Sequence, residues 1–460
     1  MPNFWDYSAW GAVNVFAVLL ISLLAANLLK KLIPVLKKML IPSSVLGGGM
    51  LVLVAGIYKL CTGNIMFDTR FFGGTGTATL ELITYHCLAL GFIASSFKSS
   101  KGRMTKQRTV EIFNTGVTTV ATYLLQGILG MAISVLAVLV VPSFFKAAGI
   151  LLPFGFGQGT GQAMNYGSIF ETENGFVNGK IFGLTIAALG FLSASVGGVV
   201  HLNILRKKGL ASAHSETAEK LEAEDIQKEN EIPMQESVDK MTVQIALVVS
   251  TYMIAYAMMC GLGRLLPGMK ATIFGFNFLL GVLAATIMRS LLNFANEKKI
   301  FRRAQVNDFL MTRTSNFFFD LMVVAGVAAI RLDALEDYWG IILIMGVVGL
   351  VSTYLYNLWV ARTLFPNYKQ EQFLMMYGML TGTASTGTIL LREIDSEFKT
   401  PAADNMVYQN FPAIVFGFPI MLLATLAPKK PYLTLIILVA FFLVMNIILF
   451  RSKIFRRKKK

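Results

Sequence analysis

Long apolar runs without a single charge alternate with short basic segments along the whole chain. No charged residue stands between Glu111 and Lys146 or between Lys180 and Arg206. Each run is longer than the roughly 18–20 residues that cross the hydrocarbon of a bilayer as a helix. Strands of a β-barrel are short and alternate apolar with polar positions. The pattern therefore predicts an all-α integral membrane protein and excludes soluble enzymes and β-barrels.

The apolar runs predict eleven spans. They cover residues 9–29, 41–58, 78–97, 110–141, 181–205, 241–266, 271–292, 308–330, 339–363, 405–426 and 432–450. Lys and Arg gather beside alternate ends of these spans, and the positive-inside rule keeps such clusters in the cytoplasm. All the large clusters fit a topology with the N-terminus outside and the C-terminus inside, and the pair Lys429-Lys430 is the one exception.

Composition supports this interpretation and removes one alternative. Only 15% of the 460 residues are charged, against about 25% in a soluble domain. The net charge of +15, from 41 Lys and Arg against 26 Asp and Glu, would indicate nucleic-acid binding in a soluble protein. Here the positive-inside rule accounts for it, so we expect no nucleic acid. The basic tail at 451–460 favours an anchor on anionic lipid over a specific partner site.

Two uncharged segments are too rich in glycine for ordinary spanning helices. The first lies at about 147–171, and the second, rich in Gly and Thr, at about 372–392. Glycine lowers helix propensity by about 1 kcal/mol per residue relative to Ala. If the first segment crossed the membrane, the cluster Arg206-Lys207-Lys208 would lie outside the cell. The charge rule therefore predicts re-entrant hairpins, which enter and leave the membrane on one face.

The two halves of the chain correspond in order and oppose in direction. Each has five predicted spans with a glycine-rich hairpin after the fourth. Such inverted-topology repeats are typical of secondary transporters, which bind their substrates where corresponding helices are interrupted. We therefore divide the chain into a first repeat (1–206), a cytoplasmic linker (207–240), a second repeat (241–430) and an additional span with the basic tail (431–460). For the mixed-charge linker, a structural tie is favoured over a regulatory domain.

Neutral groups of the hairpins are the candidate binding groups. Carbonyl and hydroxyl oxygens suit Na⁺, whereas N–H groups at half-helix starts suit a carboxylate. The predicted substrate-binding residues are Gly157, Gln158, Gly159, Thr160, Gly161, Gln162, Asn165, Thr383, Ser385, Thr386, Gly387 and Arg392. The alternative for Gly157 and Gly161 is helix packing through their GxxxG spacing. The matching Gly/Thr motif in the second hairpin favours a binding site.

Ionisable residues inside the spans are few, so each is a functional candidate. Asp320, four positions after Asn316, is the leading candidate for a cation site, against a structural ion pair with Arg313. The full set of Na⁺ candidates is Asn316, Asp320, Thr160, Thr386 and Asn410. Glu81 and His86 could form a proton path, although a near-interface acid and a buried, hydrogen-bonded histidine are favoured.

Three stretches of the sequence are informative when they are taken together and in order. They are Ile41-Pro42-Ser43-Ser44-Val45-Leu46-Gly47-Gly48, the hairpin core Gly159-Thr160-Gly161, and Asn410-Phe411-Pro412-Ala413-Ile414-Val415 with Gly417. In this order they resemble the bacterial sodium/glutamate symporter family. The resemblance covers nearly the whole chain except the linker and the tail. It implies Na⁺-coupled glutamate uptake, inverted repeats with re-entrant hairpins, a homodimer, and a transport domain that slides across the membrane against a dimerising scaffold.

The chain departs from the family pattern at three places. Gln158 stands where the family's first hairpin has His, and the stretch 383–386 replaces a glycine-richer tip. Asp320 occupies a place where the family uses a hydroxyl residue. A carboxylate other than glutamate is therefore an alternative substrate.

Taken together, these patterns predict a Na⁺-coupled symporter in the cell membrane. It would import glutamate or a related small anionic amino acid, with Na⁺ as coupling ion and no other cofactor. An ion channel is the less favoured alternative, because two unlike hairpin sequences fit rocking repeats better than a symmetric pore. No HExxH, P-loop or pair of aspartates within the spans is present in the sequence, so we expect no catalytic residues.

Overall fold

A computed structural model describes residues 3–97, 105–209, 226–227, 230–234, 237–301, 303–395 and 399–454, apart from the side chains of Lys37 and Phe411. Within these ranges the protein is helical, with no strand and one isolated bridge between Glu231 and Ala304. The basic segment 98–104, the linker segment 210–225 and the tail end 455–460 lie outside the described residues, as does Arg302 of the cluster at 298–303.

Nine helices in the described ranges are long and apolar enough to cross a membrane. They are α1 (Tyr7–Leu32), α3 (Ser43–Thr62), α4 (Gly76–Ser96), α5 (Lys106–Ala137), α7 (Gly179–Lys207), α9 (Lys240–Leu265), α11 (Asn277–Glu297), α13 (Trp339–Leu364) and α18 (Pro431–Leu449). A tenth candidate combines α16 (Ala402–Tyr408) with α17 (Asn410–Leu426), which are bent by 53° relative to each other. The protein is therefore a multi-pass membrane protein, and ten of the eleven predicted spans have a matching candidate.

The remaining predicted span, 308–330, forms helix α12 (Asp308–Ala328). Its 21 residues include Asp308, Arg313 and Asp320 together with several hydroxyl and amide side chains. These polar groups keep α12 outside the set of apolar spanning candidates, although the predicted helix itself is present.

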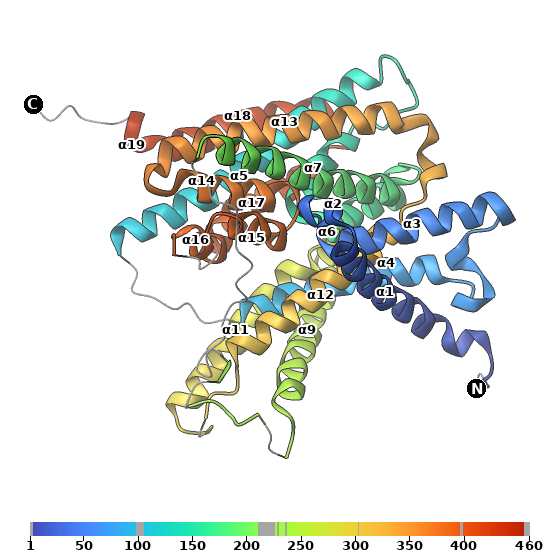
Figure 1. The fold of residues 1–460 in the computed structure, drawn as a ribbon, viewed down its shortest axis with the longest axis horizontal. Coiled ribbons are helices and arrows are strands. Elements are labelled where there is room, and N and C mark those ends of the chain that lie inside the picture. The colour runs from blue at the N-terminus through green and yellow to red at the C-terminus, as the bar shows by residue number, and fades with distance from the viewer. Residues whose placement is uncertain are drawn as a thin grey trace, which may run out of the picture. The chain divides into compact units, whose positions relative to one another are not determined.

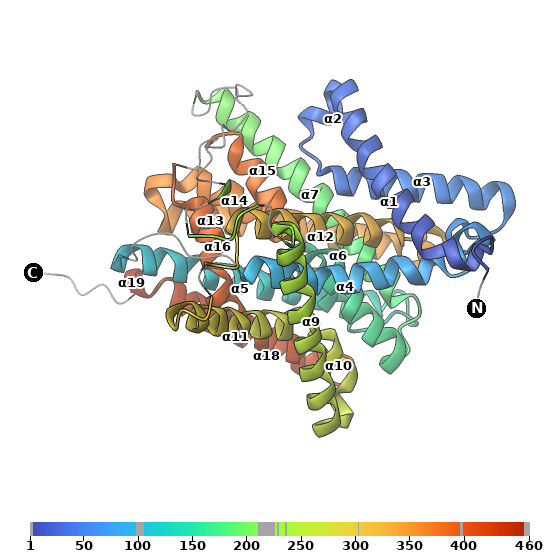
Figure 2. The ribbon, with the colours of Figure 1, turned by 90° about the horizontal axis from the view of Figure 1, so that it is seen from below.

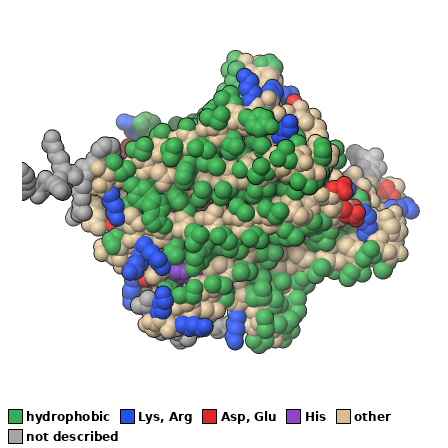
Figure 3. Space-filling view, turned by 90° about the horizontal axis from the view of Figure 1, so that it is seen from above, with side chains coloured by type: hydrophobic (Ala, Val, Ile, Leu, Met, Phe, Trp, Pro, Cys, Tyr) green, Lys and Arg blue, Asp and Glu red, His purple; other side chains and the backbone are tan. Residues whose placement is uncertain are grey.

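The apolar surfaces of several helices point away from protein. In the most apolar windows of α1, α9 and α18, only 22% of the residues are buried, against 67% in α7. Hydrophobic side chains dominate the face drawn in Figure 3. Because soluble monomers rarely expose large continuous apolar patches, these surfaces fit contact with lipid tails. Helix α7, in contrast, packs mostly on protein.

The chain forms two compact units, and each draws on both predicted repeats. Unit 1 contains residues 1–19, 67–101 and 216–325, and unit 2 contains residues 20–66, 102–215 and 326–460. In unit 1, helices α4, α9 and α11 pack together, with buried residues such as Ile93, Val248 and Ala285 between them. The short helix α10 (Lys270–Gly275) precedes α11 and packs on α9.

A buried ion pair ties the end of the linker to unit 1. The Lys240 ammonium lies 3.0 Å from a Glu231 carboxylate oxygen, and the two side chains are 0% and 4% exposed. The amide of Asn307 donates to the same carboxylate oxygen at 2.6 Å. Buried charges require such partners, because an isolated one costs far more than a hydrogen bond can return. The described end of the linker is thus held in place by a buried ion pair and a hydrogen bond.

In unit 2, α5 packs against both α13 and α18, and α13 packs against α7. These helices run side by side in Figure 1 and Figure 2. The unit also contains α6 (Leu151–Asn174), α14 (Lys369–Thr381), α15 (Ala384–Arg392) and the terminal α19 (Arg451–Ile454). Both predicted hairpin segments therefore belong to the same unit.

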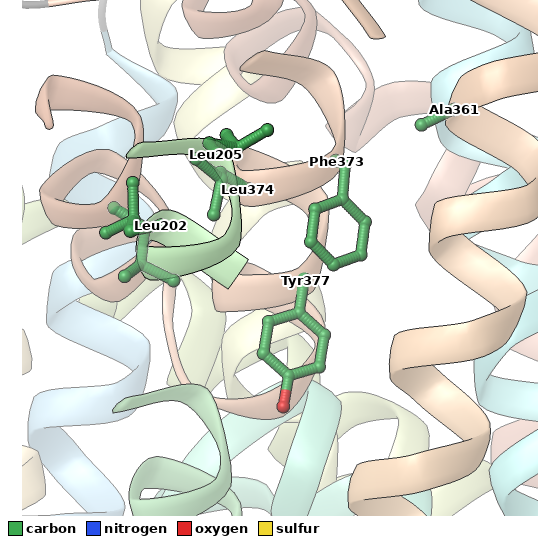
Figure 4. Packing of buried hydrophobic residues seen from close by; sticks show 7 residues of the cluster. Leu202, Leu205, Ala361, Phe373, Leu374 and Tyr377 are labelled. Carbon is green, nitrogen blue, oxygen red and sulfur yellow. The ribbon is translucent and has the colours of Figure 1, made fainter. Parts of the chain in front are cut away.

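An apolar cluster holds α14 against α7 and α13. It contains Leu202, Leu205, Ala361, Phe373, Leu374, Tyr377 and Leu390, most of which Figure 4 labels. The rings of Phe373 and Tyr377 stack with 5.6 Å between their centres. The Tyr377 hydroxyl donates to the main-chain oxygen of Ser193 on α7 at 2.7 Å. This packing fixes the first arm of the second hairpin segment.

Candidate functional site

Helix α6 is broken at Gly159 and folds back on itself. Gly159 has φ 80° and ψ −170°, a backbone conformation open to glycine but not to L side chains. The rings of Phe154, before the break, and Tyr166, after it, stack with 4.2 Å between their centres and 14° between their planes. Twelve residues of straight helix would separate them by about 18 Å. The two arms of α6 therefore lie side by side, and we call this segment hairpin 1.

Helices α14 and α15 form a second fold-back, which we call hairpin 2. They are separated only by Gly382 and Thr383. A Cβ atom on Gly378 would lie 2.7 Å from Cα of Gly387, so the two arms are in backbone contact. Thr383 caps α15, because its hydroxyl accepts from the main-chain N–H of Thr386 at 3.4 Å. Both predicted segments thus contain a helix, a break and a returning helix.

Helix α5 holds both hairpins close to their breaks. The Tyr123 hydroxyl donates to the main-chain oxygen of Gly157 in hairpin 1 at 3.0 Å. Three residues further on, the Gln126 amide donates to the main-chain oxygen of Leu380 in hairpin 2 at 2.9 Å. One turn of α5 therefore binds the two breaks at the same level.

Helix α7 touches both hairpins at Gly190. A Cβ atom there would lie 2.6 Å from the main-chain oxygen of Thr381 and 3.1 Å from Cα of Phe156. The backbones of hairpin 1 and hairpin 2 thus approach the same point of α7, and a side chain at position 190 would separate them. The two glycine-rich breaks, more than 200 positions apart in the sequence, meet in one place.

The site presents neutral polar groups in buried surroundings. Gln162 is 1% exposed, and its Oε1 accepts from the Asn165 amide at 3.1 Å. Its Nε2 has no hydrogen-bond partner in the described structure and is buried. A buried donor of this kind costs free energy unless a ligand or water accepts from it. Nε2 of Gln162 is therefore a free donor at this site.

Most of the predicted substrate-binding residues lie around this meeting point. The buried ones are Gly159, Thr160, Gly161, Gln162, Asn165, Thr386 and Gly387, and the half-buried ones are Gly157, Gln158, Thr383 and Ser385. The hydroxyls of Thr383 and Thr386 lie 3.3 Å apart. Thr160 packs beside Gly326, where a Cβ atom would lie 2.6 Å from Cβ of Thr160.

Four other predicted site residues are exposed. Arg392 is at the end of α15 in unit 2, and Asn410 accepts from the Gln409 amide at 3.2 Å. Asn316 and Asp320 lie on α12 within unit 1, whereas both hairpins belong to unit 2. His86, also in unit 1, lies 2.8 Å from the Tyr252 hydroxyl; it is hydrogen-bonded as favoured above, but exposed rather than buried.

Sequence reasoning missed the residues of α5 and α7 that hold the hairpins. Gln126 and Gly190 lie inside uncharged runs, where they count as parts of ordinary spans. A usable signal was the row of Thr115, Thr119, Thr122 and Gln126, whose spacing of three and four residues places polar groups on one face of a helix. That face packs against α13, α14 and the residues just before α17.

A pocket of about 530 Å³ opens at the first turns of α5, away from the hairpin breaks. Its polar lining includes Lys106, Glu111, Tyr368 and Lys453. The Tyr368 hydroxyl donates to the Glu111 carboxylate at 2.8 Å, and Arg108 pairs with that carboxylate at 3.0 Å. Burial raises the pKa of the Tyr368 phenol, so it keeps its proton and remains a donor at neutral pH.

Within the described ranges, no group of three or more His, Cys, Asp or Glu side chains is placed to hold a metal ion. The oxygens that surround the hairpin breaks belong to carbonyl, hydroxyl and amide groups.

In the comparison with known proteins, the chain matches a family model. The model of the sodium/glutamate symporter family matches residues 9–373, a stretch that includes the whole of hairpin 1 and ends within α14. No curated protein matches the chain.

Proposed function

Because the chain belongs to the sodium/glutamate symporter family, we propose that it imports glutamate into the cell together with Na⁺. The family is one of transporters and not of enzymes, and membership indicates Na⁺-coupled transport of glutamate. The observation that carries the proposal is the meeting of two broken helical hairpins at Gly190. Interrupted helices at corresponding places of two halves are where secondary transporters bind their substrates.

The groups at the breaks suit an anionic amino acid. The second arm of hairpin 1 and helix α15 both begin at the breaks, and main-chain N–H groups at helix starts attract carboxylates. The Nε2 donor of Gln162 adds a hydrogen bond to the same kind of oxygen. We assign glutamate as the substrate, with a related small carboxylate as the alternative because of Gln158.

Na⁺ is the proposed coupling ion, and no other cofactor is needed. The hydroxyl oxygens of Thr160 and Thr386, both fully buried, are candidate ligands near the breaks. Asn316, Asp320 and Asn410 are the other candidate ligands. Each Na⁺ that enters down a potential of about 100 mV supplies about 2.3 kcal/mol before its concentration gradient is counted.

The proposed mechanism is alternating access by an elevator movement. Unit 2, which contains both hairpins, acts as the transport domain, and the hairpins are re-entrant segments of two inverted repeats. Support comes from the order of the helices, with a fold-back after the fourth predicted span of each half. The protein would form a homodimer in the cell membrane, with the N-terminus outside and the C-terminus in the cytoplasm.

Uptake of labelled glutamate into proteoliposomes tests the function. We expect accumulation with an inward Na⁺ gradient and none with matched K⁺. The Thr160→Ala/Thr386→Ala double variant should lower the initial rate by about tenfold or more, since each lost ligand contact weakens binding by about 1 kcal/mol. Thr434→Ala, which removes a buried hydroxyl from α18, is the matched control and should transport normally.

Folded wild-type protein that accumulates no glutamate under any gradient would overturn the substrate assignment. Equal uptake with Na⁺ and K⁺ would overturn the coupling ion. Unchanged uptake by the double variant would remove the two hydroxyls from the site.

A further inference from the structure

Two buried amide oxygens between α5 and α13 have no hydrogen-bond partner, and we propose that they bind the coupling Na⁺. Gln126 on α5 is 0% exposed and Asn357 on α13 is 1% exposed. In the described structure neither Oε1 of Gln126 nor Oδ1 of Asn357 accepts a hydrogen bond. The proposal rests on Na⁺-coupled transport as proposed above, and it places the ion at residues other than the hairpin hydroxyls.

The orientation of both amides is fixed by main-chain carbonyls. Nε2 of Gln126 donates to the main-chain oxygen of Leu380 at 2.9 Å and to the Thr353 hydroxyl at 2.9 Å. Nδ2 of Asn357 donates to the main-chain oxygen of Thr353 at 2.9 Å. A carbonyl can only accept, so rotating either amide by 180° would place two oxygens against each other. The unpartnered atoms are therefore oxygens and not N–H groups.

These side chains form two successive polar contacts, or rungs, between the antiparallel helices α5 and α13. Gln126 bonds to Thr353, and one turn away Nδ2 of Asn357 lies 3.4 Å from the Thr122 hydroxyl. We call Thr122, Gln126, Thr353 and Asn357 the α5–α13 seam. Its two rungs are one helical turn apart, which is about 5.4 Å. Oxygens that bind a hard cation of the size of Ca²⁺ or Na⁺ lie about 2.3–2.6 Å from it, so one ion can contact both rungs.

The chemistry of the seam selects a monovalent cation. The unpartnered atoms are acceptors, which rules out an anion as their ligand. All four side chains are neutral, whereas sites for divalent cations normally include carboxylates. Leu380 is in the last turn of α14, where the carbonyls of a helix end favour positive charge. Neutral oxygens beside a half-helix C-terminus are the environment in which transporters hold Na⁺.

The seam is connected to the substrate site through one side chain. Gln126 presents its oxygen to the seam and donates through its nitrogen to Leu380, two residues before Gly382 at the break of hairpin 2. A cation on Oε1 fixes this side chain and strengthens its hold on the hairpin. Substrate binding at the breaks and ion binding in the seam therefore favour each other, as coupled transport requires.

The first test measures Na⁺ binding to the purified full-length protein without substrate. Thermal stability is followed against Na⁺ concentration, with K⁺ replacing Na⁺ at constant ionic strength. In Gln126→Leu and in Asn357→Leu we expect the half-saturating Na⁺ concentration to rise by about tenfold or more. Ser134→Ala is the control and should leave it unchanged. It removes another buried, unpartnered oxygen from α5, about 12 Å further along the helix.

The variant Asn357→Asp separates ion binding from a purely structural role. It keeps an oxygen in the seam but loses the N–H bond to Thr353, so Na⁺ should still saturate it, at a concentration no higher than for wild type. If Asn357→Asp and Asn357→Leu lose the Na⁺ response equally, the seam is structural and the proposal is overturned.

The remaining outcomes distinguish this proposal from the function it rests on. The wild-type protein could respond to Na⁺ while both leucine variants keep its half-saturating Na⁺ concentration. This result would overturn the proposed Na⁺ site in the seam and leave Na⁺ coupling intact. The Na⁺ site is also overturned if the leucine variants bind Na⁺ normally and only their half-saturating glutamate concentration rises. The amide oxygens of Gln126 and Asn357 would then bind the substrate ammonium or an ordered water. A wild type without any Na⁺ response, yet with glutamate uptake, overturns the coupling ion itself.

Discussion

Replacing Gly190 by Leu should abolish Na⁺-driven glutamate uptake while the protein still folds and reaches the membrane. Even a Cβ atom at this position would lie 2.6 Å from the main-chain oxygen of Thr381 and 3.1 Å from Cα of Phe156. These neighbours are backbone atoms of the two hairpins, so they cannot rotate away as a flexible side chain would. Hairpin 1 and hairpin 2 must then separate, and the groups that receive the substrate lose their relative positions.

The effect should already be visible with the smallest side chain. Overpacking costs about 1–3 kcal/mol in a close-packed interior, and a loss of 1.4 kcal/mol in substrate binding corresponds to about tenfold in affinity. We expect Gly190→Ala to lower initial uptake rates by about tenfold and Gly190→Leu to reach background. Size-exclusion profiles of the purified variants verify folding.

Gly49→Ala provides the matched control, because a Cβ atom on this glycine of α3 meets nothing within 4 Å. Its uptake and thermal stability should equal those of wild type. Normal uptake by folded Gly190→Leu would show that the two hairpins do not act as one site.

The sequence predicts the position of this site more readily than it predicts the residues of α5 and α7 that contact the hairpins. Glycine density predicted breaks at about 147–171 and 372–392, and the structure places them at Gly159 and at Gly382-Thr383. Six glycines in an uncharged segment disfavour a continuous helix whatever surrounds it, so a local rule was enough. The two fold-backs were therefore accessible before any coordinates.

The residues that contact the hairpins depend on which faces of the long helices pack together. Apolar runs carry little information about the packing partners of a helix. Gln126 and Gly190 stand in uncharged stretches that identify spans without identifying partners. Arg392 is a different case. Its charge beside the second hairpin predicts a substrate contact, and its side chain is exposed in the structure, so that contact stays a prediction. Charge is conspicuous in an apolar sequence, whereas buried amides and glycines become informative only once their neighbours are known.

Helix α12 shows a limit of hydropathy as well. Its charged and hydroxyl residues remove it from the apolar candidates, although Ser315 donates to the main-chain oxygen of Gly91 on α4 at 2.9 Å and is buried there. Polar groups on a helix that packs on protein find partners there. A hydropathy average counts them equally whether they face lipid, protein or water.

The second large effect should arise in unit 1, where Lys240→Ala is expected to destabilise the protein by about 3–5 kcal/mol. This change leaves the Glu231 carboxylate, 4% exposed, without the ammonium that lies 3.0 Å from it. Asn307 still donates to one of its oxygens at 2.6 Å, but a neutral donor does not replace a buried counter-ion. Chemical unfolding of unit 1 in detergent, followed by an environment-sensitive probe on α9, measures the loss.

Two further variants give this prediction its specificity. Glu231→Leu/Lys240→Met removes both charges and should recover most of the stability, because a buried pair contributes little beyond a well-packed apolar one. Glu393→Ala breaks a more exposed ion pair in unit 2, in which Arg206 is 38% and Glu393 20% exposed. The probe on α9 in unit 1 should report a change of no more than about 1 kcal/mol for this variant. If the double variant is as unstable as Lys240→Ala, the pair matters through its packing or hydrogen bonds rather than through charge neutralisation. If Lys240→Ala itself unfolds at the same denaturant concentration as Glu393→Ala, the linker is not held to unit 1 by this ion pair.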